Sequence, residues 1–173
     1  MGQSVALVHN FAERLHYSQV ASDEPFWVKV YQNAFPNLVN QMPCIGDNEA
    51  QRKGIDRVLL LANGVTLRID EKKREKEYDD VLLEYVSNDK TGAAGWIEKD
   101  LSIDYLAYAF MPSKRCFLFD WQTLRRAWVT HKQDWMQSYK RIPARNATYT
   151  TWSIAIPTKT LMIAIAKSML IQV

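Results

Sequence analysis

An Asn-Gly dipeptide at positions 63 and 64 separates two short apolar runs, residues 55–61 and 65–72. Asn and Gly readily adopt the positive φ angles that a tight β-hairpin turn needs, so this pattern predicts two paired antiparallel strands. If the dipeptide alone formed the turn, the strands would pair positions whose numbers add up to about 127. The expected hairpin constrains the rest of the fold, because one face of it must be buried.

The predicted hairpin carries charged residues that a buried strand pair does not need. The expected register sets Asp56 against position 71, beside Asp70 on the partner strand. Side chains two residues apart on a strand point to the same face, so Asp70 and Lys72 project together while Glu71 points away. Two carboxylates and one ammonium group are therefore expected to converge.

Adjacent carboxylates repel each other, and such a pair persists where a divalent cation or a cationic side chain neutralises it. Oxygen ligands without imidazole or thiolate favour a hard ion, Mg²⁺ or Mn²⁺. The pattern predicts either a metal site of this kind or a salt-bridged cluster at a sheet edge, where lysine also discourages pairing with another sheet.

The other periodic segments predict one domain over residues 1–173, because a chain of this length is too short for two ordinary domains. The expected helices cover residues 3–17, 22–36, 121–139 and 159–170, with a short helical turn at 49–52. Further strands are expected at 81–87, 114–120 and 151–157. This order predicts an α/β or α+β sandwich around a central mixed sheet.

The charge is divided unevenly along the chain. Residues 1–110 hold 12 Lys and Arg against 17 Asp and Glu, whereas residues 111–173 hold 10 against 2. This division fits carboxylates that bind a metal beside a surface that attracts phosphates, and it equally fits ordinary solvated charge. The candidate phosphate contacts in the basic part are Lys114, Arg115, Arg125, Arg126, Lys140, Arg141 and Arg145.

The two cysteines, Cys44 and Cys116, stand alone without the spacing of a zinc site or a disulfide framework, so we expect a reducing, cytoplasmic location. The N-terminus lacks the pattern of a secretion signal. The apolar tail from Leu161 to Val173 is too short to cross a bilayer, so no membrane association is expected.

Gly54-Ile55-Asp56, the hairpin, and Ile69-Asp70-Glu71-Lys72 resemble the PD-(D/E)xK nuclease superfamily, which includes restriction endonucleases, Holliday-junction resolvases and phage nucleases. The resemblance implies a restriction-endonuclease-like α/β/α sandwich, with a central mixed β-sheet flanked by helices. The sequence departs from the family pattern because isoleucine, not proline, precedes the first acid.

The resemblance also implies roles for individual residues. Asp56 and Asp70 would be metal ligands, the main-chain carbonyl of Glu71 a further ligand, and Lys72 the catalytic lysine. Glu49 is the expected acid on the preceding helix. Gln51 is a second polar candidate for the catalytic site. Glu84, within residues 81–87, is a reserve candidate for a further ligand and equally fits an outward-facing acid on a strand.

Together these features predict a Mg²⁺- or Mn²⁺-dependent endonuclease that hydrolyses phosphodiester bonds of DNA, of a phage or mobile-element type and with homodimers possible. The alternative is a non-catalytic nucleic-acid-binding or protein-binding protein on the same fold, and a structural phage or plasmid protein is a third possibility. The sequence does not specify whether the substrate is duplex, branched, single-stranded or RNA.

Overall fold

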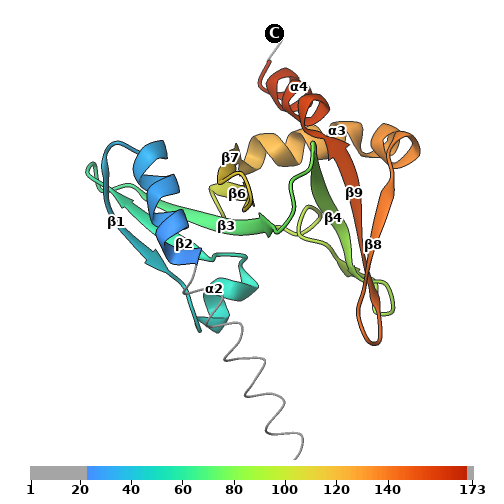
Figure 1. Ribbon diagram of the computed structural model, residues 1–173, viewed down its shortest axis with the longest axis horizontal. Helices are drawn as coiled ribbons and strands as arrows, with labels where there is room; N and C mark the ends of the chain where they lie inside the picture. Colours follow the sequence, from blue (N-terminus) through green and yellow to red (C-terminus); the bar gives the residue numbers. More distant parts are fainter. Residues whose placement is uncertain (1–22, 171–173) are drawn as a thin grey trace, which may run out of the picture.

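A computed structural model describes residues 23–170 of the protein, and the helix predicted over residues 3–17 lies outside them. Figure 1 shows a mixed α/β fold in which two β-sheets stand side by side and helices pack against them. The α/β class predicted from the sequence is confirmed. The strands, however, form two sheets where the sequence predicted one.

The first sheet is mixed and has the strand order β1-β2-β3-β6-β7. Its strands are β1 (Leu38–Pro43), β2 (Arg57–Leu61), β3 (Thr66–Arg74), β6 (Tyr105–Phe110) and β7 (Arg115–Asp120). Neighbouring strands are antiparallel except β3 and β6, which run parallel. The helix over residues 23–34 covers one face of this sheet (Figure 1). Its Trp27 and Tyr31 side chains belong to the same buried cluster as Leu59 and Ile69.

The second sheet is antiparallel and has the strand order β5-β4-β9-β8. Its strands are β4 (Asp80–Asn88), β5 (Ala93–Ala94), β8 (Arg141–Arg145) and β9 (Thr150–Pro157). The strands predicted at 81–87 and 151–157 belong here. The highly charged segment after β3 leads into β4, which pairs with β9 and not with a strand of the first sheet.

Strand β6 was not predicted, and its burial explains why. Leu106, Tyr108 and Phe110 face a core shared with the second sheet and the C-terminal helices, whereas Ala107 and Ala109 face the helix over residues 23–34. A strand buried on both faces has a continuous apolar sequence without the alternation that identifies a half-buried strand.

The predicted hairpin is present, but its turn is one residue longer than expected. The N–H of Leu61 donates to the carbonyl of Val65 at 2.9 Å, so Ala62, Asn63 and Gly64 form a three-residue loop with Gly64 at φ +81°. Paired positions therefore add up to 126, as in the pair of Arg57 with Ile69, and not to 127. The expected register was wrong by one residue because Asn-Gly also suits a three-residue loop that ends in a left-handed glycine.

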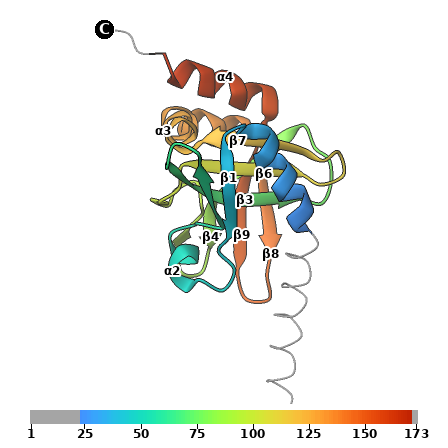
Figure 2. The same ribbon diagram turned by 90° about the vertical axis from the view of Figure 1, so that its left-hand side faces the viewer.

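The helices are α2 (Asn48–Arg52), α3 (Trp121–Ser138) and α4 (Thr158–Ser168), close to the predicted bounds. Asp120 caps α3 by accepting the N–H of Thr123 at 2.8 Å. The buried side of α3 includes Leu124 and Trp128, and Figure 2 shows α4 lying above α3. Within residues 23–170, no helix is long and apolar enough to span a membrane.

Candidate functional site

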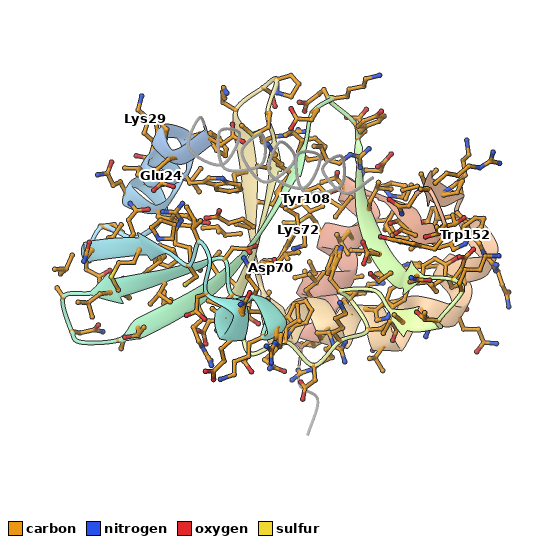
Figure 3. All side chains as sticks on the ribbon, turned by 90° about the horizontal axis from the view of Figure 1, so that it is seen from below. Glu24, Lys29, Asp70, Lys72, Tyr108 and Trp152 are labelled. Carbon is orange, nitrogen blue, oxygen red and sulfur yellow. The ribbon has the colours of Figure 1, made fainter. Side chains whose placement is uncertain are left out.

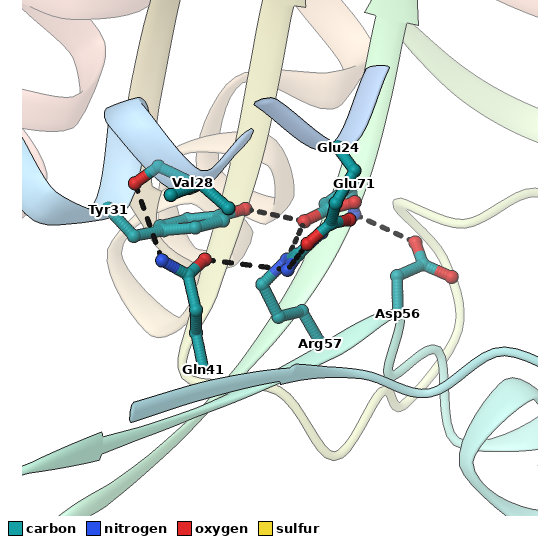
Figure 4. A network of polar contacts seen from close by, with 7 residues as sticks. All are labelled: Glu24, Val28, Tyr31, Gln41, Asp56, Arg57 and Glu71. Carbon is teal, nitrogen blue, oxygen red and sulfur yellow. Dashed lines mark hydrogen bonds and ion pairs between the residues drawn. The ribbon is translucent and has the colours of Figure 1, made fainter. Parts of the chain in front are cut away.

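Asp56 lies immediately before β2 and is attached to β3 through both its backbone and its side chain. Its N–H donates to the carbonyl oxygen of Ile69 at 2.8 Å, and its Oδ2 accepts the N–H of Glu71 at 2.8 Å (Figure 4). These two bonds flank Asp70 on β3. They hold the Asp56 carboxylate beside that of Asp70, as the sequence predicted.

Asp70 and Lys72 extend from the same face of β3 (Figure 3). Asp70 is only 2% exposed, and its Oδ1 accepts a hydrogen bond from the ammonium group of Lys72. Its other oxygen, Oδ2, is buried and meets no hydrogen-bond donor among the described residues. Buried carboxylate oxygens are ordinarily satisfied by donors or by a metal ion, so an orphaned oxygen here fits a cation ligand.

The protonation of this cluster follows from burial and from its neighbours. Burial raises the pKa of the Asp70 carboxyl to about 7, with the Lys72 ammonium opposing the rise and the adjacent Asp56 carboxyl adding to it. Burial would lower the pKa of Lys72, but the carboxylates of Asp70 and Asp56 outweigh it and raise the pKa. A divalent cation would stabilise the ionised form of both acids.

These side chains open onto a cavity of about 170 Å³. The hairpin contributes Asp56, Asp70 and Lys72, the α2 region contributes Gln51, Arg52 and Gly54, and the segment after β5 contributes Trp96, Lys99 and Leu101. Among residues 23–170, no three or more His, Cys, Asp and Glu side chains form a ready metal-binding group. The candidate metal site therefore consists of two carboxylates beside a lysine.

Glu71 faces the opposite side of β3, as predicted, and takes part in a buried ionic network around Arg57 (Figure 4). Arg57 is 1% exposed and donates to Glu71 at 2.7 Å and to both oxygens of Glu24 at 2.8 and 2.7 Å. The Tyr31 hydroxyl donates to Glu71 at 2.9 Å. The network thus joins the helix over residues 23–34 to β2 and β3 directly behind Asp56.

A second cavity, of about 220 Å³, lies on this opposite side and is larger than the first. Four acids line it: Glu24 and Glu71 share Arg57, Asp23 binds Lys73 at 2.7 Å, and Asp56 lines both cavities. The hydrogen bond from Arg57 lowers the pKa of Glu24, whereas burial raises that of Glu71. We place the candidate site in the smaller cavity because Asp70, whose Oδ2 has no donor among the described residues, lines that cavity and not the larger one.

Of the other acidic and polar candidates, some lie at the cavity and others do not. Gln51 lines the cavity, but Glu49 is not brought there: its side chain is 79% exposed and pairs with Lys53 at 2.7 Å. Glu84, on β4, lies close enough to Lys72 and Lys99 to interact with them electrostatically. Burial raises its pKa, while the backbone N–H of Trp96 and the ammonium groups of Lys72 and Lys99 lower it.

Several of the predicted phosphate contacts are engaged with the protein itself. Arg125 donates to the carbonyls of Ile97 and Lys99, and Arg126 donates to the carbonyl of Ser168 at 2.9 Å. Arg115 pairs with Glu77 at 2.6 Å.

The remaining four predicted phosphate contacts lie elsewhere on the surface. Lys114 lies over the Phe26 ring, and Arg141 makes a 3.4 Å contact with the Met136 carbonyl. Lys140 and Arg145 are exposed near the β8–β9 hairpin. The structure brings none of the seven predicted contacts into the lining of the cavity.

The sequence did not predict Arg52 and Lys99 as site residues, although both line the cavity. Neither falls in the basic part of the chain, and no local pattern links the end of α2 to the segment after β5.

Comparison with known proteins adds no assignment: the chain matches no protein-family model, no curated protein and no solved structure.

The Arg57 network generates a prediction about stability. Arg57→Ala leaves Glu71 and Glu24 without their buried partner, so the free energy of unfolding should fall by about 3–5 kcal/mol in urea titrations. Arg68→Ala is the matched control, because Arg68 is 43% exposed in its 3.0 Å pair with Asp104. The control should lose less than about 1 kcal/mol. Equal losses in the two variants would contradict the role given to the network.

The raised pKa of Asp70 generates a prediction about pH. The folded protein keeps this proton at pH values where the unfolded chain has released it, so the contribution of Asp70 to the free energy of unfolding falls as pH rises toward 7. In EDTA, the wild type should lose stability relative to Asp70→Asn between about pH 5 and about pH 8. Urea unfolding of both proteins at the two pH values measures this difference. A difference that is constant with pH would show that Asp70 titrates normally.

Proposed function

We propose that the protein is a Mg²⁺- or Mn²⁺-dependent nuclease that hydrolyses phosphodiester bonds of DNA, as a nuclease of PD-(D/E)xK type. The observation that supports this most is the buried Asp70 carboxylate, which has one oxygen without a donor, adjoins the Asp56 carboxylate and lines a cavity together with Lys72. The same hairpin arrangement carries the resemblance to the superfamily.

The residues present fit a hard divalent ion. Mg²⁺ in proteins is commonly held by one or two carboxylates and keeps several waters, which a site made from Asp56 and Asp70 in a cavity of about 170 Å³ can accommodate. Arg57 does not compete for these acids, because its guanidinium binds Glu71 and Glu24 instead. The main-chain carbonyl of Glu71 is proposed as a further ligand.

The chain's own residues have distinct roles in the proposed reaction. When bound, the ion would polarise the phosphodiester and lower the pKa of the attacking water. Asp56 and Asp70 would hold the ion, and the hydrogen bond from the Glu71 N–H would fix the orientation of Asp56. Lys72 would orient the water or stabilise the negative charge that develops on the phosphate oxygens. Attack by the water oxygen on phosphorus breaks the bond to the leaving oxygen, which takes up a proton.

The ion pair between Lys72 and Asp70 favours one alternative, a non-catalytic nucleic-acid-binding or protein-binding protein on the same fold. In that case the lysine would neutralise the buried acid permanently, and no ion would be needed. A titration with Mn²⁺ separates the two functions, because only a catalytic site should bind the ion.

Replacing Asp70 tests the proposed function. Asp70→Asn removes the ligand charge with little change in shape, so Mg²⁺-dependent cleavage of labelled DNA should fall on the order of 10²–10³-fold. Asp134→Asn, an exposed acid on α3, is the control and should cleave like the wild type. Circular dichroism would establish that both variants fold. If the folded Asp70→Asn protein cleaves as fast as the wild type, the assignment is wrong.

A further inference from the structure

The mouth of the candidate site carries two cations that form no salt bridge in the described part of the chain, although Lys99 lies close enough to Glu84 to lower the pKa of that acid. Arg52 and Lys99 line the cavity and are exposed, and neither forms an ion pair with any residue in the described part of the chain. The cations next to them behave differently. Lys53 pairs with Glu49 at 2.7 Å, and Lys132 pairs with Glu98 at 2.6 Å.

Lys99 is held at the mouth by a rigid turn. Its N–H donates to the carbonyl of Gly95 at 3.2 Å, and its own carbonyl accepts the Arg125 guanidinium at 3.0 Å. Gly95 itself packs so closely on the backbone of Glu84 that a Cβ would lie 2.2 Å from the Glu84 carbonyl oxygen. The residue before Lys99, Glu98, accepts the indole N–H of Trp128 at 3.1 Å. Because Arg125 binds the carbonyl oxygen of Lys99, it fixes the position of this lysine at the mouth.

Arg52 reaches the same mouth from the end of α2, whose start is capped by Asp47. The turn that follows packs directly against the segment carrying Lys99. Gly54, at φ +75°, lies so close to Leu101 that a Cβ would stand 2.9 Å from its side chain. The Ser102 N–H donates to the carbonyl of Lys53 at 3.1 Å. The two walls of the mouth are thus joined, and their cations are held at the same opening.

The charges of the lining indicate an anionic ligand. Asp56 and Asp70 contribute two negative charges, which one divalent cation would cancel, and Lys72, Arg52 and Lys99 contribute positive charge. A phosphodiester has one negative charge shared by two non-bridging oxygens, so one oxygen can face the ion while the other faces the cations at the mouth.

We propose that Arg52 and Lys99 form a clamp for the phosphodiester of DNA at the mouth of this cavity. The clamp rests on the proposed function and names the residues that hold the substrate backbone at the site. It also assigns Arg125 a different role from the one the sequence predicted. Arg125 acts as a positioning residue for Lys99 and does not itself bind phosphate.

Equilibrium binding tests the clamp. Fluorescence anisotropy would follow a labelled DNA duplex and a labelled single strand of the same sequence, with Ca²⁺ in place of Mg²⁺. Arg52→Ala and Lys99→Ala should each weaken binding about tenfold and lower the slope of log Kd against log salt concentration by about one. Lys99→Arg should keep most of the affinity. Lys53→Ala removes a neighbouring cation outside the cavity and should bind like the wild type.

The clamp is wrong if Arg52→Ala and Lys99→Ala bind like Lys53→Ala, or if the wild type binds neither form of DNA. Cleavage measured with the same proteins separates this failure from failure of the nuclease itself. If cleavage depends on Asp70 but Arg52→Ala and Lys99→Ala leave KM unchanged, only the clamp is overturned. If the wild type cleaves no DNA with Mg²⁺ or Mn²⁺, the proposed function fails, and the anisotropy still shows whether the two cations hold a DNA backbone.

Discussion

The buried guanidinium of Arg57 is the interaction on which the arrangement of the site depends. It binds Glu71 on β3 and Glu24 on the helix over residues 23–34, so three elements are fixed together by charge-assisted hydrogen bonds. The backbone N–H of Glu71 donates to the Asp56 carboxylate at 2.8 Å. The network therefore ties the helix to the two strands that position Asp56 and Asp70, and Arg57 itself does not line the cavity that contains Asp70.

The alternation of side chains along β3 explains how a buried hairpin can carry so many charges. Glu71 and Lys73 point toward the helix over residues 23–34; Glu71 pairs with Arg57 of β2, and Lys73 pairs with Asp23 at the start of the helix. Asp70 and Lys72 point the other way, toward the cavity, where one carboxylate oxygen is left without a donor. On one face of the strand each charged side chain therefore has a salt-bridge partner, whereas the other face has a carboxylate oxygen that can accept a ligand.

The sequence predicts the parts of this site that depend on local rules. Turn chemistry and two-residue alternation were enough to bring Asp56, Asp70 and Lys72 together, although the loop took one residue more than expected. Lys99 could not be foreseen, because only tertiary packing brings it beside the end of α2. The sequence predicted Arg125 as a phosphate contact but could not reveal the carbonyls that it binds. Strand β6 escaped detection because both of its faces are buried.

The central claim is that Asp56 and Asp70 share a hard divalent cation, and crystals soaked in Mn²⁺ test it most directly. The account expects an anomalous peak within bonding distance of both carboxylates, with the Lys72 ammonium moved away from Asp70. If the cavity stays free of anomalous signal at saturating Mn²⁺ while Lys72 keeps its contact with Asp70, the cluster is an internal salt bridge and the account is contradicted.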